Sequence, residues 1–202
     1  MLVWINGPFG GGKTQTAFEL RRRLHGSVVC DPEFVGYGLH RSMPAELRGD
    51  FQDLPAWRQG VVEVLDLVLN QHKGVVIAPM TVVHPDYFAE TVGRLREIGH
   101  DVRHFALLAE HDTVRERLRG RGLPGMRFGL RFETFALERI DHCLEALQRP
   151  EFGEHIHTDH LGVAAVADRI AASANLTLTP NTDSALRTRL RQARVTLSHI
   201  RL

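Results

Sequence analysis

A short segment near the start of the chain combines glycines, a lysine and a threonine at a spacing suited to holding phosphate groups. Gly7 is followed by Gly12, Lys13 and Thr14, directly after an apolar run at residues 2–6. Glycine lets the backbone wrap closely around an anion and point N–H groups at it, while lysine adds positive charge and threonine a hydroxyl ligand for Mg²⁺. The pattern therefore predicts a P-loop that binds ATP and Mg²⁺. Its expected contacts are Gly7, Phe9, Gly10, Gly11, Gly12, Lys13, Thr14 and Gln15.

A carboxylate that can take part in proton transfer follows the second apolar run. Asp31 comes directly after residues 27–30, and Glu33 is close behind. Ligands of parallel sheets collect at the carboxyl ends of the strands, so we expect Asp31 in the same cleft as the phosphate loop. There it can accept the proton of a hydroxyl group, or hold Mg²⁺ together with Thr14. The alternative is that Asp31 caps a loop, with Glu33 as the reserve candidate for the base.

Arginines that can stabilise the charge of a migrating phosphoryl group gather at residues 115–131. Val114 and Leu118 mark the core-facing side of a short helix, and Arg117 and Arg121 flank that side. The glycine-rich stretch that follows predicts a mobile lid. The predicted catalytic residues are therefore Asp31, Lys13, Arg117 and Arg121.

Residues 31–58 interleave aromatic and charged side chains, and the prolines and glycines at residues 31–54 predict an irregular excursion outside the core. Such a segment can form a pocket for a large, partly apolar acceptor molecule, completed by residues that follow the next strand. The alternative is a small accessory core under a flap. The residues expected to bind the acceptor are Phe34, Tyr37, Arg41, Phe51, Trp57, Met80 and His84.

These groups need a scaffold, and short apolar runs alternate along the chain with segments of helical period. The expected strands are 2–6, 27–30, 74–78, 102–109 and 155–158. The expected helices are 13–24, 56–72, 85–98, a short helix capped by Asp112, 133–147, 161–173 and a separate one beyond Pro180. This order predicts an α/β, three-layer P-loop kinase-like fold with a parallel sheet of about five strands. We expect one domain at residues 1–180 and a C-terminal amphipathic helix at 181–202.

The composition is that of one ordinary globular domain. The chain has 202 residues, 43% of them hydrophobic, and its formal net charge of +1 gives no reason to expect a nucleic-acid partner. Its two cysteines, Cys30 and Cys143, are far apart, which suits a reducing compartment. The first residues do not resemble a signal peptide, and no run reaches the roughly 20 apolar residues of a membrane-spanning helix. The prediction is a cytoplasmic protein; the oligomeric state does not follow from these features.

Two further features separate the classes of P-loop protein. The guanine-reading tetrapeptide Asn-Lys-x-Asp is absent from the sequence, which argues against a GTPase switch. The apolar run 74–78 ends in Pro79 and Met80, where motor and transporter ATPases carry an acidic residue that binds Mg²⁺. A small-molecule kinase fits the remaining features best.

Several stretches of the sequence resemble the bacterial tunicamycin-resistance proteins, P-loop proteins of the nucleotide-kinase class, over nearly the whole chain. The matching stretches are 4–10, 13–20, 50–53 with Pro55, Trp57 and Arg58, 79–88, 155–159 and 197–201. The resemblance implies ATP binding and protection against tunicamycin, a nucleoside antibiotic bearing sugars and a fatty acyl chain. Residues 123–138 depart from the family pattern, so the resemblance assigns no lid role to Arg127 or Arg131.

The resemblance leaves the mechanism open. The primary hypothesis is a kinase that transfers the γ-phosphoryl group of Mg·ATP to a hydroxyl of tunicamycin or a related nucleoside. The alternative is a non-catalytic protein that uses ATP to order a drug-binding cleft and sequesters the drug, and a third is a nucleotide or sugar kinase of ordinary metabolism.

The C-terminal segment has the pattern of a basic amphipathic helix. Its apolar positions alternate four and three residues apart, with arginines between them. Such a helix at 186–202 can lie on an anionic membrane surface, or it can dock on its own domain or on a second subunit. The apolar positions are Leu186, Leu190, Ala193, Leu197 and Ile200.

Overall fold

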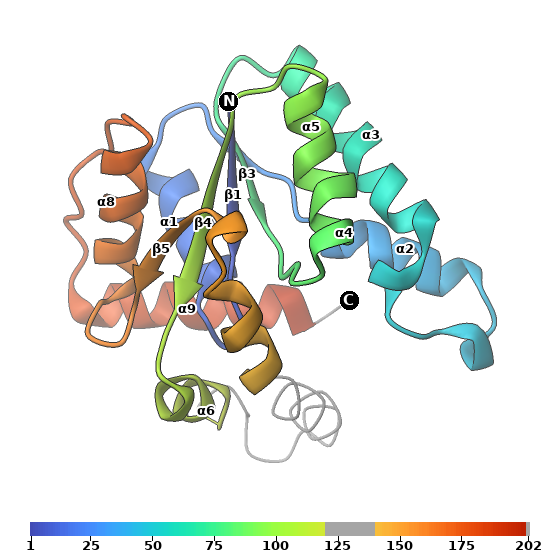
Figure 1. Ribbon diagram of the computed structural model, residues 1–202. Helices are drawn as coiled ribbons and strands as arrows, with labels where there is room; N and C mark the ends of the chain where they lie inside the picture. The colour runs from blue at the N-terminus through green and yellow to red at the C-terminus, as the bar shows by residue number, and fades with distance from the viewer. Residues whose placement is uncertain (120–139, 201–202) are drawn as a thin grey trace.

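The fold is built on a five-stranded, fully parallel sheet with the strand order β2-β3-β1-β4-β5 (Figure 1). The computed structural model describes residues 1–119 and 140–200. The predicted parallel sheet is thus confirmed, although β2 is shorter than expected. The strands are β1 Leu2–Asn6, β2 Val28–Val29, β3 Val76–Pro79, β4 Val102–Leu108 and β5 Glu154–His157.

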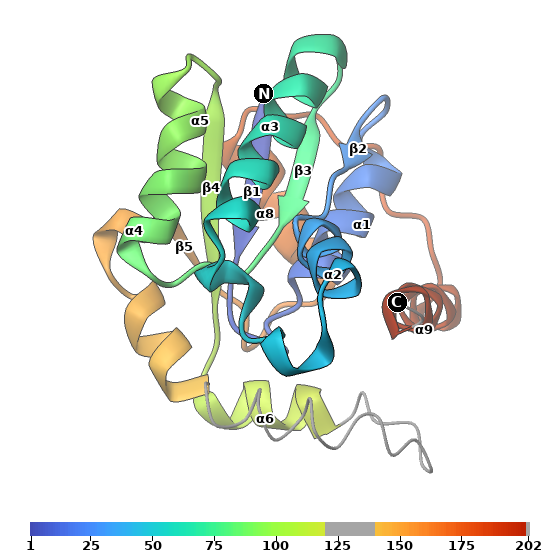
Figure 2. The ribbon, with the colours of Figure 1, turned by 90° about the vertical axis from the view of Figure 1, so that its right-hand side faces the viewer.

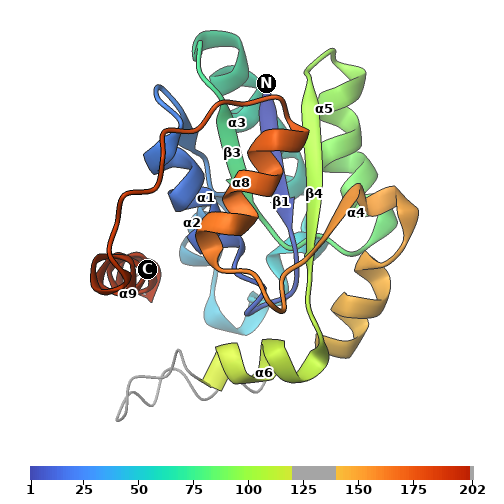
Figure 3. The ribbon, with the colours of Figure 1, turned by 90° about the vertical axis from the view of Figure 1, so that its left-hand side faces the viewer.

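Helices cover both faces of this sheet, which makes the three layers that the sequence predicts. Helices α1 and α8 lie on one face, and α3 with the run from α4 to α5 lies on the other (Figures 2 and 3). Residues 140–147 are also helical. The helices are α1 Lys13–Arg23, α2 Glu33–Ser42, α3 Pro55–Gln71, α4 Pro85–Phe88, a π-helical turn at Ala89–Gly93, α5 Arg94–Glu97, α6 His111–Arg119, α8 Val163–Ser173 and α9 Ala185–Ile200, with 3₁₀ turns at Ala45–Leu47, Phe51–Asp53 and Pro150–Phe152.

The side chains of β1 show why the core has two halves. Successive residues of a strand point to opposite faces, so Trp4 packs among residues of α3 and α5, while Val3 and Ile5 pack against α1 and α8. Every residue of β1 is buried, as expected for a central strand covered on both faces. The strand therefore holds the loop that follows it in a fixed position.

The segment 31–54 is more regular than its composition suggests, and its placement outside the core was wrong. It contains helix α2 and two 3₁₀ turns, and Val35 and Phe51 pack on the main hydrophobic core. Position 36 of α2 is a glycine because the ring of Phe51 packs against it. A Cβ at this position would lie 2.5 Å from that ring. A glycine that permits close packing was thus interpreted as a helix breaker.

Two other helices differ in detail from the sequence predictions. Asp112 does not cap α6: it is exposed in the first turn, and the carboxylate that accepts a hydrogen bond from the Glu110 amide belongs to Asp159. The expected helix 133–147 is described only from residue 140 onward, and its earlier part lies outside the described residues.

Helix α9 lies apart from the sheet (Figure 3) and contacts one side of α1. The described part of its predicted apolar stripe does not face the domain, because Leu186 and Leu190 are 68% and 64% exposed and Ala193 is exposed as well. The side that faces α1 instead carries Arg191, Gln192 and Val195. Among the described helices, none is both long and apolar enough to cross a lipid bilayer.

Candidate nucleotide and acceptor site

The P-loop connects β1 to α1 at the carboxyl edge of the sheet, where ligands of parallel sheets bind. Helix α1 begins at Lys13 with Gly12 as its N-cap, and neither a capping side chain nor an acidic residue occupies its first turn. The positive end of the helix is therefore left to an external anion. The Lys13 side chain is buried, and its Nζ donates a hydrogen bond to the Pro8 carbonyl at 3.1 Å. This donor set fits a polyphosphate, with Thr14 as the loop residue that would hold its Mg²⁺.

Helix α6 packs directly on the P-loop, at the carboxyl edge of the sheet (Figure 2). Phe9 joins the small cluster formed by Val114, Leu118 and residues of the 140–147 helix, so its side chain supports the loop from outside. Gly10 has a φ of +81°, and a Cβ on it would lie 2.9 Å from Leu118 Cγ. The predicted core-facing positions Val114 and Leu118 are confirmed, since both are buried.

A set of buried hydrogen bonds that the sequence did not reveal ties the P-loop to the segment after β3. The Asn6 side chain donates to Val82 O at 2.7 Å and accepts from the backbone amides of Val82 and Gly7 at 3.1 and 2.9 Å. Thr81 Oγ1 donates to Gly7 O at 2.7 Å. The one sequence feature that could have indicated these hydrogen bonds was a polar residue, Asn6, at the end of an apolar strand directly before the glycine motif.

The predicted base Asp31 lies at the end of β2, two strands away from the P-loop strand on the same edge of the sheet. It is 8% exposed, and its Oδ1 accepts a hydrogen bond from the Glu33 amide at 3.0 Å. Asp31 thus stabilises the first turn of α2, which was the alternative reading of this residue. Glu33 accepts a hydrogen bond from the Tyr37 hydroxyl at 3.1 Å. Burial, reinforced by the Glu33 carboxylate, raises the pKa of Tyr37 well above its usual value.

The residues predicted to bind the acceptor divide into exposed side chains and side chains packed in or against the core. Phe34 is 46% exposed on α2, and Arg41 is exposed on the same helix. Phe51 packs edge-on against Tyr37 and at a tilt on Trp57, with ring centroids 6.2 and 5.5 Å apart. The expectation of direct contact is corrected for two side chains: Trp57 and Met80 are almost fully buried in the core.

His84 stacks on Tyr87, whose ring also contacts Arg58, and neither Tyr87 nor Arg58 was predicted to bind the acceptor. The His84 ring lies 4.4 Å from that of Tyr87, and the Arg58 guanidinium lies 4.4 Å from the same Tyr87 ring. The Tyr87 hydroxyl donates to Asp53 at 2.9 Å, and Arg58 pairs with Glu90 at 2.5 Å. The exposed His84 ring is therefore held on an ordered support beside the segment that Asn6 ties to the P-loop.

The lid arginines are only partly within the described residues. Arg117 donates to Thr158 Oγ1 at 2.9 Å and to Thr158 O at 2.6 Å, so it joins α6 to the loop after β5. In the same loop, partial burial of Asp159 is outweighed by hydrogen bonds from the Glu110 amide and Thr113, which hold the pKa of its carboxyl below the usual value. Arg121 and most of the predicted lid lie outside the described residues.

Gln15, the last predicted contact of the nucleotide, faces α9. Its Nε2 donates to Gln192 O at 2.9 Å and to Thr196 Oγ1 at 3.0 Å. Within the described residues, no group of three or more His, Cys, Asp or Glu side chains is close enough to hold a metal ion. A Mg²⁺ held by one or two protein oxygens and the phosphates of a nucleotide needs no such group.

Comparisons with known proteins agree with this architecture. Residues 2–150 match the AAA domain family. A tunicamycin resistance protein from Deinococcus radiodurans is 32% identical with a TM-score of 0.74, over 89% of this chain and 99% of that one. A sugar kinase from Janibacter sp. HTCC2649 (18% identity, TM-score 0.60, 87% and 95% of the two chains) and a gluconokinase from Sinorhizobium meliloti 1021 (14%, 0.59, 86% and 90%) share the fold. No curated protein matches the sequence significantly.

The parallel sheet, its strand order and the loop after β1 define a P-loop protein with a kinase-like, nucleotide-binding fold. By the domain match and by the likeness to a relative along nearly its whole length, the chain belongs to the tunicamycin-resistance protein family.

Proposed function

We propose that this protein confers resistance to tunicamycin-like nucleoside antibiotics by transferring the γ-phosphoryl group of ATP to a hydroxyl of the drug. The observation that carries the proposal is the P-loop, which stands at one edge of the sheet with the Asp31 carboxylate and the His84 stack. The 32% identical relative named for tunicamycin resistance supplies the drug class.

In the proposed reaction the hydroxyl oxygen of the drug attacks the γ-phosphorus and ADP leaves. Asp31 accepts the hydroxyl proton, and Lys13 with Arg117 stabilises the charge on the transferred group. Mg²⁺, held by Thr14 and by Asp31 through water, would neutralise phosphate charge. Phe34, Tyr37, Arg41 and His84 are proposed to bind the acceptor, and Trp57 and Met80 to support that surface from the core.

Mass spectrometry of tunicamycin after incubation with the purified protein, Mg²⁺ and ATP is the direct test. We expect a drug species heavier by one phosphoryl group, and formation of ADP that depends on the drug. Lys13→Ala should abolish both signals, because the charge beside the phosphates is lost. An unchanged drug mass with the wild-type protein would contradict the kinase proposal.

A second candidate is ATP-dependent binding and sequestration of the drug without chemistry, at a membrane surface. The observation that favours it is α9, whose Leu186 and Leu190 are exposed beside the arginines at 187, 189 and 194. Such a face suits an anionic bilayer, where an acylated drug also partitions. Asp31→Asn distinguishes the candidates: a kinase loses drug protection, whereas a sequestering protein keeps most of it.

A further inference from the structure

The first turn of the nucleotide-binding helix is attached to the last helix of the chain. Gln15 follows Thr14 directly in α1, and its side-chain amide reaches both the backbone of Gln192 and the hydroxyl of Thr196 in α9. The Thr196 hydroxyl in turn donates to Gln192 O at 3.0 Å, which fixes the acceptor that Gln15 uses. Gln15 is separated from Gln192 by 177 positions in the sequence and from Thr196 by 181, yet these residues meet directly beside the P-loop motif.

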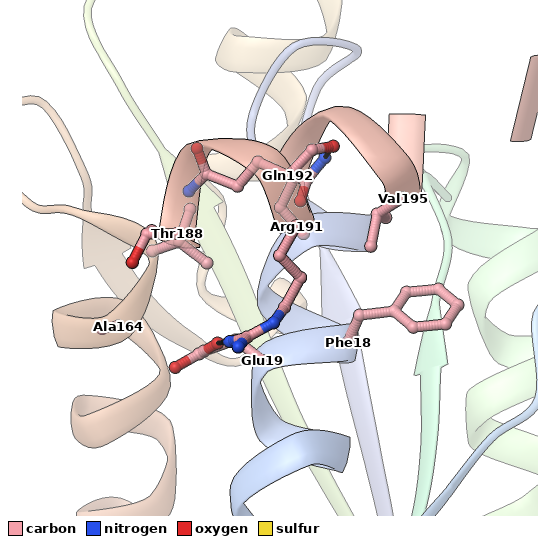
Figure 4. A pocket seen from close by; sticks show the side chains of 9 residues that line it. Phe18, Glu19, Ala164, Thr188, Arg191, Gln192 and Val195 are labelled. Atoms are coloured by element: carbon pink, nitrogen blue, oxygen red, sulfur yellow. Dashed lines mark hydrogen bonds and ion pairs between the residues drawn. The ribbon is translucent and has the colours of Figure 1, made fainter. Parts of the chain in front are cut away.

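A closed ring of alternating charges forms the second attachment. Glu19 of α1 pairs with Arg22 at 2.5 Å, Arg22 with Asp183 at 3.5 Å, Asp183 with Arg191, and Arg191 with Glu19 at 3.7 Å. Figure 4 shows Arg191 extending from α9 to Glu19, with Phe18 and Val195 on the other side of the pocket between the helices. The Glu19 and Asp183 side chains are each only 10% exposed, so these pairs are better shielded from salt than surface pairs.

In the part of α9 whose side chains are described, the contacts with α1 are mostly polar. Among the residues of α9 whose burial the structure describes, Val195 alone is buried, while Leu186 and Leu190 point to solvent. Hydrogen bonds and ion pairs of this kind depend strongly on geometry, and each contributes only modestly to the stability of the contact. The seating of α9 must therefore depend on where Gln15 and Glu19 stand, and hence on the order of α1.

We propose that α9 is part of the nucleotide site: Gln15 is a positioning residue through which seated α9 orders the first turn of α1, so that seating of α9 and binding of a nucleoside triphosphate favour each other. A site that is ordered beforehand loses less entropy when the polyphosphate binds, and the coupling is reciprocal. The inference rests on the proposed nucleotide binding, but it holds for a kinase and for a sequestering protein alike.

The variant Arg191→Glu tests the proposal, because it places a third carboxylate beside Glu19 and Asp183 and must unseat α9. Arg189→Glu is the matched control, since it makes the same charge change at an exposed position of the same helix. Affinity for a non-hydrolysable ATP analogue is measured by calorimetry, and seating of α9 by hydrogen exchange. We expect Arg191→Glu to lower the affinity for the analogue roughly tenfold, and Arg189→Glu to lower it less than about twofold. In the wild type, saturating analogue should slow exchange in residues 191–196.

Arg191→Lys, which keeps the charge, should restore most of the affinity. If Arg191→Glu does not fold, Arg191→Ala combined with Thr196→Val removes the ion pairs of Arg191 and the hydrogen bond from Gln15 to Thr196, with Thr196→Ser as the version that keeps the hydroxyl. The proposal is overturned if α9 exchanges freely in the variant while affinity stays at the wild-type value, or if α9 stays protected without the ring. Failure of the wild type to bind the analogue would instead refute the proposed function.

Discussion

Gly10 shows how a single missing methyl group supports the site. Its φ of +81° lies in the region that L side chains rarely adopt, and a Cβ would meet Leu118 Cγ at 2.9 Å and Val114 O at 3.1 Å. Its contact is with α6, so Gly10 is needed for helix packing as well as for wrapping the loop around phosphate. A substitution there must move either the loop or the helix that carries Arg117.

We therefore expect Gly10→Ala to destabilise the protein by about 1–3 kcal/mol and to weaken nucleotide binding. Gly38→Ala is the control: Gly38 lies in α2 with open space around its Cα, and alanine there should raise stability by about 0.5–1 kcal/mol. Urea unfolding and calorimetric titration measure the two effects. Equal stability of both variants would contradict the packing argument.

His104 is a buried histidine on β4 that makes stability depend on pH. Burial, together with the nearby charges of Arg96 and His155, lowers its pKa to about 3. Because the unfolded chain binds the proton near the ordinary value, the histidine lowers stability only as the pH falls from about 6.5 toward 3. Its ring lies 4.7 Å from Phe88, so an apolar side chain suits the position.

We expect the free energy of unfolding to fall by up to about 1.4 kcal/mol per pH unit across this window on account of His104. His104→Leu should flatten that part of the profile, whereas replacement of the exposed His25 by glutamine should leave it unchanged. Denaturant unfolding between pH 7 and 4 provides the measurement. A wild-type slope retained in His104→Leu would show that other groups cause the acid sensitivity.

At the scale of elements, the junction of β1 and β3 decides how the two halves of the site are spaced. The strands stay in register up to Ile5 and Pro79, and beyond that point the Asn6 side chain continues the pairing with Val82. The hydroxyl of Thr81 then holds Gly7. Displacement of either segment would therefore change the distance between the phosphates and the surface around His84.

Thr81→Val keeps the shape of the side chain but leaves the Gly7 carbonyl without its hydroxyl donor. We expect a loss of about 1–3 kcal/mol in unfolding free energy, and a larger fall in phosphoryl transfer to the drug than in ATP affinity. Thr81→Ser keeps the donor and should lie close to the wild type in both. Identical transfer rates for the valine and serine variants would show that the hydrogen bond does not set the spacing.

At the scale of the whole molecule, our proposals assign functions to two outward-facing surfaces. The carboxyl edge of the sheet carries the proposed nucleotide and acceptor site, and α9 lies below the sheet (Figure 1). The Leu186 and Leu190 side chains of α9 are exposed beside its arginines. Because the described contacts of α9 with α1 are mostly polar, Leu186 and Leu190 are available to a lipid surface without unfolding of the domain.

Leu186→Ser combined with Leu190→Ser should lower co-sedimentation with phosphatidylserine-containing vesicles at least about threefold, because the two large apolar side chains that are exposed in the described part of the helix are lost. Val64→Ser with Leu67→Ser removes similar exposed area from α3 and should leave vesicle binding unchanged. Binding that is insensitive to the α9 pair, or equally sensitive to both pairs, would exclude α9 as the membrane contact.

The P-loop, the parallel sheet and the family were readable from the sequence because each depends on local patterns. The loop is a run of contiguous residues, and the alternation of apolar runs with helical periods reports βα units. Apolar spacing likewise identified Val114 and Leu118 as core-facing. The assignment of residues 31–54 as irregular failed because Gly36 has the same local appearance whether it breaks a helix or accommodates an aromatic ring.

Only the tertiary structure decided which distant groups meet. Asn6 and Val82 are 76 positions apart and Gln15 and Thr196 are 181 apart, and their hydrogen bonds depend on how strands and helices pack. The same holds for α9: its sequence determined an amphipathic helix, but the polar contacts offered by Glu19 and Gln15 decided which side faces the domain. Local patterns specify elements, whereas burial and charge pairing between elements specify their contacts.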